Sequence, residues 1–158
     1  MKFNEMINIE WDESTGLLIT CEDLEFDTAT NIVFPIKQGY MLMITPEEKK
    51  IYSDKVLNFK KELCLDAVEN INEKVQSINR SDEIDLESWI KENKLKKIVT
   101  LSTPVGYVND YINSKKNEMR DCSVELIKVF REYDMKFWNF ANKGFFNFFQ
   151  KAKTKLAN

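Results

Sequence analysis

The residues that could carry out chemistry are few, because the sequence contains no histidine. Histidine is the commonest general base and metal ligand, so its absence removes the Ser-His and Cys-His pairs that activate a nucleophile. Cys21, Cys64 and Cys122 are too far apart for a C-x-x-C motif, and we expect three buried thiols in a reducing compartment. The four glycines are isolated, which excludes a phosphate-binding loop and a dinucleotide fingerprint. We therefore expect no catalytic residues and no cofactor.

Carboxylates are the remaining candidates for catalysis or metal binding. Spaced acids near a lysine can hold divalent cations in a nuclease. The simpler interpretation is that Asp85 caps a short helix and that its neighbours lie near the positive end of that helix. We favour this interpretation, and predict no metal site. The cluster consists of Asp82, Glu83, Asp85 and Glu87, followed by Glu92 and Lys94.

A second group of acids lies on a predicted strand near the N-terminus. These residues could form a ligand strip, but an exposed acidic strand face is the simpler interpretation. Residues 1–46 carry eight acids and two lysines, whereas residues 123–158 carry three acids and seven basic residues. The two ends are therefore expected to face different neighbours, or each other, and nucleic-acid binding is not expected from a chain of net charge −3. The acids on the predicted strand are Glu22, Asp23, Glu25 and Asp27.

Aromatic residues concentrate at the C-terminal end, where residues 123–158 hold seven of the eleven phenylalanines. On a helical wheel the stripe after Gly144 narrows to a few positions, and Phe146 falls outside it. Three interpretations remain open: packing against the core, an exposed patch for protein contacts that include a homodimer, and a basic amphipathic helix on an anionic membrane. The partner-binding candidates are Trp138, Phe145, Phe146, Phe148, Phe149 and Lys151.

The elements that would position these residues suggest a single α+β domain. Residues 1–45 alternate apolar and polar side chains, which predicts an antiparallel β-meander of three to five strands with turns at Gly16 and Gly39. Thr45, Pro46 and Glu48 predict the start of a helix over 46–79, and a shorter helix is expected over 86–97. Residues 98–101 are ambiguous between a strand and a buried connector. Residues 104–158 are expected to form two helices with a joint near 113–117, the last one aromatic, and the alternative is one long helix.

One face of the helix over 46–79 is expected to pack against the meander. Its apolar residues recur every three or four positions. They are Tyr52, Val56, Phe59, Leu63, Ala67, Val68, Ile71, Val75 and Ile78.

These patterns favour a non-enzymatic protein-interaction module, such as an inhibitor, an immunity-type protein or a chaperone-like binder. It would use the aromatic C-terminal helix, the acidic sheet, or both, and would also form a homo-oligomer. The first alternative is a peripheral membrane protein that binds through the same C-terminal helix, and the second is a metal-dependent carboxylate enzyme. No apolar stretch approaches the length needed to span a bilayer, so we expect a cytoplasmic protein.

Overall fold

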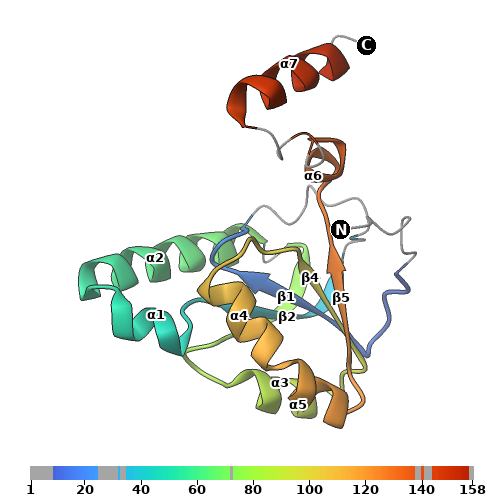
Figure 1. The fold of residues 1–158 in the computed structure, drawn as a ribbon. Helices are drawn as coiled ribbons and strands as arrows, with labels where there is room; N and C mark the ends of the chain where they lie inside the picture. The colour runs from blue at the N-terminus through green and yellow to red at the C-terminus, as the bar shows by residue number, and fades with distance from the viewer. Residues whose placement is uncertain are drawn as a thin grey trace.

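In the computed structural model five parallel strands form one sheet, in the order β3-β2-β1-β4-β5 (Figure 1). The structure describes residues 9–24, 32, 35–71, 73–137, 140 and 144–156. The strands are β1 (Thr15–Thr20), β2 (Ile36–Leu42), β3 (Val75–Arg80), β4 (Lys97–Leu101) and β5 (Glu125–Val129). The helices are α1 (Pro46–Ile51), α2 (Asp54–Ile71), α3 (Leu86–Glu92), α4 (Tyr107–Ser114), α5 (Lys116–Asp121), α6 (Glu132–Phe137) and α7 (Phe145–Leu156).

The sheet grows from β1 in two directions. β2 and then β3 add on one side of β1, after which the chain returns and adds β4 and β5 on the other side. The connections from β2 to β3, from β3 to β4 and from β4 to β5 each contain helices. The direction reverses between β1 and β4, so their carboxyl ends form the topological switch point of a doubly wound α/β sheet.

Both faces of the sheet are buried under helices. On one face, Leu17 and Met41 belong to a core that includes Cys64 of α2. On the other face, Leu18 belongs to a core with Trp89 of α3 and with residues of α4 and α5. This two-sided burial explains why all six residues of β1 are buried.

The predicted α+β fold with an antiparallel meander over 1–45 is wrong, because β1 and β2 are both strands but pair in parallel. A short alternating segment does not reveal which strand it pairs with, so alternation alone is equally compatible with sequential hairpins. The unbroken apolar run Leu17–Leu18–Ile19 is the signal that favoured a strand buried on both faces. Part of the predicted meander, including residues 25–31, lies outside the described residues.

Helix was also predicted too far in three places. The short helix expected over 86–97 is α3, which ends at Glu92, and Lys97 already belongs to β4. The expected helix over 46–79 is α1, α2 and then β3, because Val75 and Ile78 fit the spacing of a helix but belong to a strand. The expected helical segment 104–158 contains β5, which occupies the outer edge of the sheet. The ambiguous residues 98–101 belong to β4. In each case pairing with a distant strand overrides a periodicity that is compatible with both elements.

Two of the predicted helix starts are confirmed. The Thr45 backbone N–H donates to Glu48 Oε2 at 2.8 Å and the Glu48 N–H donates to Thr45 Oγ1 at 3.3 Å, which completes a capping box for α1. Asp85 Oδ1 accepts from the Ser88 N–H at 3.0 Å and caps α3. The start expected at 103–104 is displaced, because α4 begins at Tyr107.

Gly16 and Gly39 are strand residues, and the turns predicted at both positions are wrong. Among the described glycines, positive φ angles occur at Gly106 and Gly144 and not at these two positions. Gly16 instead leaves space for the indole of Trp89, because a Cβ at position 16 would lie 2.5 Å from Trp89 Cη2. Glycine at this position therefore serves packing and not chain reversal.

Candidate binding surfaces

Helix α7 lies outside the α/β body, beyond α6 (Figure 1). It packs back through two residues: the ring of Phe148 lies 6.5 Å from that of Phe137, and Ala152 is buried. Lys151 and Lys155 lie over the ring of Phe140, with Nζ-to-centroid distances of 6.0 and 5.8 Å. One narrow side of α7 is therefore anchored to the chain.

Most of the apolar surface of α7 is uncovered. The exposed fractions are 69% for Phe145, 83% for Phe146, 53% for Phe149 and 71% for Leu156. We call these four residues the α7 patch. The rings of Phe145 and Phe149 are stacked with centroids 6.0 Å apart, and Phe146 packs its edge against Phe145 at 5.7 Å. The phenylalanines thus form one continuous aromatic surface.

The other C-terminal candidates have different positions. Phe148 is half-buried in the contact with Phe137, and Lys151 is exposed beside Phe140. Trp138 lies outside the described residues. The candidates that the structure places together on an open surface are therefore Phe145, Phe146 and Phe149.

The acidic candidates do not form a strand face, because β1 ends at Thr20 and they follow it. Glu22 is exposed at the carboxyl end of the sheet. Asp23 is buried and forms an ion pair with Arg131, which follows β5. Glu25 and Asp27 lie outside the described residues. The predicted acidic strand face is therefore wrong for Glu22 and Asp23, and Asp23 has a structural partner within the chain.

A second apolar surface lies on α1 and α2, and four of its residues, all but Ile51, were expected to be buried. The exposed fractions are 56% for Ile51, 37% for Tyr52, 41% for Val56, 60% for Phe59 and 42% for Leu63. We call these five residues the α2 patch. The expectation that this face is buried is wrong, although the spacing of its residues is that of a helix stripe.

The residues of α2 that do contact the sheet form a neighbouring face of small and medium side chains. Cys64, Ala67 and Ile71 are buried there. The apolar arc of α2 is wider than the area that the sheet covers, so its larger side chains remain outside. Helix periodicity identified the apolar arc, but it could not tell which half faces the sheet.

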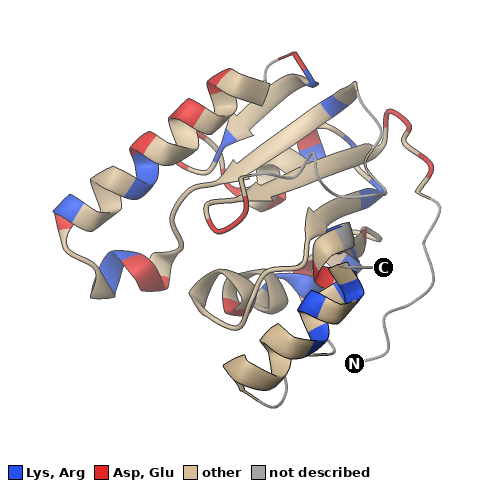
Figure 2. Ribbon diagram, turned by 90° about the horizontal axis from the view of Figure 1, so that it is seen from above, with Lys and Arg blue, Asp and Glu red and all other residues tan. Residues whose placement is uncertain are grey.

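The two helices that carry these patches differ in charge (Figure 2). α7 has Lys151, Lys153 and Lys155 and no acid. α2 has four acids and three lysines, and two of those lysines are engaged. Lys60 pairs with Glu48, and Lys61 Nζ lies 3.9 Å from Asp82 Oδ2. The remaining charges of α2 are mainly negative.

The switch point at the carboxyl ends of β1 and β4 holds a group of polar residues. The Thr20 hydroxyl is buried and has no hydrogen-bond partner among the described residues. Thr20 alternates with Ile19 and so lies on the same side of the sheet as Leu18, whose core includes Val108 of α4. Gly106 is the N-cap of α4, and no side-chain cap hydrogen bond is present at this helix start within the described part of the chain. The N–H groups at the start of α4 therefore remain available to an acceptor.

Lys128 of β5 lies beneath α4. Its Nζ donates to Asn109 Oδ1 at 3.0 Å, and burial together with repulsion from Lys116 lowers the pKa of this ammonium. Glu22 lies on the other side, where its Oε1 is 3.8 Å from the position of a Cβ at Gly106, and partial desolvation raises the pKa of its carboxyl group. The start of α4 is thus bordered by one cation and one carboxyl group.

The cysteines do not form an activated nucleophile. Burial raises the pKa of the Cys21 thiol, and it raises the pKa of the Cys64 thiol to about 12. Both thiols therefore stay protonated near neutral pH, where the thiolate is the reactive form. Cys122 is exposed, so the expectation of three buried thiols is wrong for this residue.

We predict that one thiol per chain reacts with Ellman's reagent in the folded protein at pH 8. The reacting residue is expected to be Cys122, because it is the exposed cysteine and burial raises the pKa of the other two thiols. A Cys122→Ser variant should show no rapid reaction, and denaturant should release the remaining thiols in both proteins. Rapid labelling of two or more thiols without denaturant would contradict the prediction.

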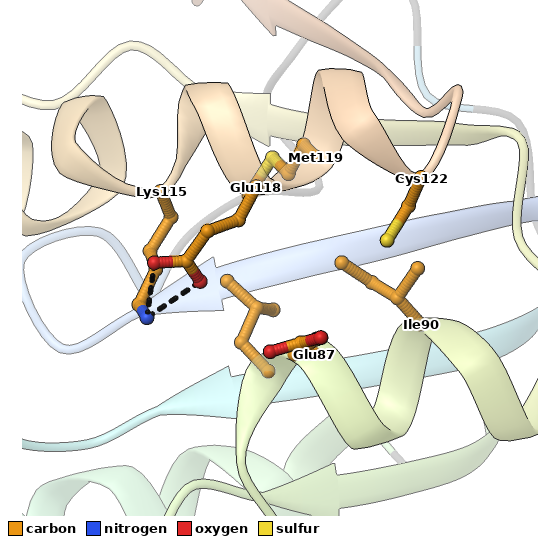
Figure 3. A pocket seen from close by; sticks show the side chains of 7 residues that line it. Glu87, Ile90, Lys115, Glu118, Met119 and Cys122 are labelled. Carbon is orange, nitrogen blue, oxygen red and sulfur yellow. Dashed lines mark hydrogen bonds and ion pairs between the residues drawn. The ribbon is translucent and has the colours of Figure 1, made fainter.

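A small cavity lies between α3 and α5, lined by Leu86, Glu87, Ile90, Lys115, Glu118, Met119 and Cys122 (Figure 3). Lys115 Nζ lies 2.7 Å from Glu118 Oε2 at one side of this cavity. Its volume of about 10 Å³ is close to the space that one water molecule needs. The cavity is therefore too small to bind an organic ligand.

The acidic cluster before α3 has structural roles. Asp85 caps α3, while Arg80 forms ion pairs with Asp82 and Glu83. No group of three or more metal-ligating side chains occurs within the described part of the chain. In the same part, none of the helices is both long and apolar enough to cross a membrane. Comparisons with protein-family models, with curated proteins and with solved structures found no match.

Proposed function

We propose that the protein is a protein-interaction module that docks α7 into an apolar groove of another protein. The observation that carries this proposal is the exposure of the α7 patch, in which each of Phe145, Phe146 and Phe149 is more than half exposed. With about 200 Å² per phenylalanine, the patch offers roughly 500 Å² of apolar surface. Contiguous exposed patches of this size are often binding sites.

The positive charge of α7 favours a partner with a negatively charged surface. Lys153 borders the exposed apolar residues, whereas Lys151 and Lys155 lie over Phe140, and α7 contains no acid to neutralise them. A groove bordered by carboxylates would therefore favour α7 over a neutral helix of the same shape. A helix that presents anchors at three- and four-residue spacing to such a groove follows a common mode of peptide recognition.

Affinity purification from the native host tests this proposal. Full-length protein and a Phe149→Asp variant are used as bait, with Asn147→Asp on the opposite side of α7 as the matched control. We expect a partner that the wild type and the control retain and the variant loses. Equal recovery with all three baits would contradict docking through α7. Flotation of the wild type with anionic phospholipid vesicles, but not of Phe149→Asp, would favour the membrane alternative.

A second candidate function is the binding of a small anion, such as a phosphate group, at the switch point. What supports it is the unpartnered hydroxyl of Thr20 together with the uncapped start of α4 and the cation of Lys128. Helix N-termini and hydroxyl groups bind phosphate, and ligands of doubly wound sheets bind outside the carboxyl ends of the strands at this point. Glu22 would oppose an anion at this position.

We predict that pyrophosphate raises the melting temperature of the wild type and not that of Thr20→Val. Without ligand, Thr20→Val should leave the free energy of unfolding unchanged or raise it by up to about 1 kcal/mol, since it removes an unpartnered buried hydroxyl. Glu22→Gln should strengthen the pyrophosphate effect by removing a negative charge. Differential scanning fluorimetry with sulfate as the ionic-strength control measures all three. A melting temperature that pyrophosphate leaves unchanged in the wild type would rule out this site.

A further inference from the structure

We infer that the α2 patch is the docking site for the α7 patch of a second copy of this chain. The result would be a two-fold dimer in which each α7 lies along α2 of the other copy. This inference rests on the proposed function, because it names the partner of α7. Both surfaces are uncovered in the chain, and α7 and α2 lie apart in both views of the molecule (Figures 1 and 2).

The two patches have matching shapes. In α2, Val56, Phe59 and Leu63 follow one another at spacings of three and four residues, which places them in a row along the helix. In α7, Phe145 and Phe149 are four residues apart, with stacked rings. Two such rows can interdigitate as ridges into grooves when the helices pack side by side.

The charges beside the two rows are opposite. Glu62 and Asp66 follow Phe59 and Leu63 by three residues, so these carboxylates border the row on α2. Lys153 follows Phe149 by four residues and borders the row on α7. Like charges beside the two rows would repel each other. The opposite charges instead let a lysine of one copy meet carboxylates of the other.

The available area requires that the contact occur twice. From the exposed fractions and about 200 Å² for a phenylalanine, each patch offers roughly 400–500 Å². One α7–α2 contact would then bury at most about 900 Å² in total, which is below the range of about 1,200–2,000 Å² for stable complexes. Two reciprocal contacts reach about 1,800 Å², which falls within it. A two-fold dimer provides this reciprocity because every copy carries both patches.

Sedimentation velocity of the full chain over a wide concentration range tests the inference. We expect the wild type to dimerise, and Phe59→Asp and Phe149→Asp each to weaken dimerisation by about 100-fold or more, because each buries an unpaired carboxylate at the contact. Both side chains are more than half exposed, so the fold should survive, which circular dichroism checks. Asn147→Asp adds the same charge on the side of α7 opposite Phe149, and Asn58→Asp adds it about 100° around α2 from Phe59. Both variants should dimerise like the wild type.

Two further arms identify the contact. The Phe59→Asp chain retains α7, and the Phe149→Asp chain retains the α2 patch, so an equal mixture should form a weak heterodimer that neither variant forms alone. Glu62→Lys and Lys153→Glu should each weaken the dimer, and the double variant should restore part of the loss. A Phe59→Asp chain that dimerises like the wild type would overturn the inference, since α7 would then pair with another surface.

A wild type that is monomeric at every concentration would also overturn the inference. The proposed function would survive that outcome if α7-dependent capture of a different protein persists in the host experiment. The proposed function would fail together with the inference only if the Phe149→Asp bait captures the same proteins as the wild type in the host experiment. The two failures are therefore distinguishable.

Discussion

Replacing Glu48 with alanine is expected to lower the free energy of unfolding by about 3 kcal/mol, the largest effect that we predict for a single residue. The carboxyl group of Glu48 is almost completely buried, pairs with Lys60, and accepts hydrogen bonds from the Thr45 backbone N–H and hydroxyl at 2.8 and 3.0 Å. The variant loses the side-chain half of the capping box, because the Thr45 N–H loses its acceptor, and leaves a partly buried ammonium without its partner. Urea denaturation followed by circular dichroism measures the change.

The neighbouring residue provides the control for this prediction. Glu47 is an exposed acid in the same turn of α1, so Glu47→Ala should change the unfolding free energy by less than about 0.5 kcal/mol. Replacing both Glu48 and Lys60 with methionine should cost less than Glu48→Ala, because no buried charge is then left unpaired. Equal losses in the Glu47 and Glu48 variants would show that the buried pair contributes little.

The capping signals at Thr45 and Asp85 predicted two helix starts correctly. The capping residues Thr45 and Asp85 contact backbone groups only three positions away, so their roles follow from short-range geometry alone. Strand pairing depends on residues far apart in the chain, as in the contact between β1 and β4. Alternation indicates that a segment can be a strand, but it does not specify a parallel or an antiparallel neighbour. The α/β fold was missed for this reason.

The same distinction applies to the candidate surfaces. Phe145, Phe146 and Phe149 were identified from composition, because so many aromatic residues in one short segment exceed what one narrow face can bury. The α2 patch was not identified, because a helix wheel shows an apolar arc without showing which part of it the sheet covers. The signal that was available is side-chain size: the covered face contains Cys64 and Ala67, which allow close approach to the sheet.

Replacing Gly16 with alanine is expected to lower the free energy of unfolding by about 2–3 kcal/mol through overpacking. The added Cβ would lie 2.5 Å from Trp89 Cη2 and 2.8 Å from Leu95 Cδ1. Trp89 is fully buried and its ring is rigid, so the backbone of β1 or the whole of α3 must shift. Elsewhere in a strand the same change would be neutral or slightly stabilising, since glycine loses more conformational entropy on folding. Chemical denaturation distinguishes these two signs.

A double-mutant cycle assigns the cause of this loss. Phenylalanine at position 89 lacks the part of the indole ring that the new Cβ would meet, so Trp89→Phe opens space at the cost of a cavity. The Gly16→Ala/Trp89→Phe variant should therefore be more stable than the sum of the single losses predicts, by about 1–2 kcal/mol. Additive losses would mean that the crowding at Gly16 arises from Leu95 or from the backbone. In that case a smaller side chain at position 95 should relieve the crowding instead, because Leu95 Cδ1 would also lie within 3 Å of the new Cβ.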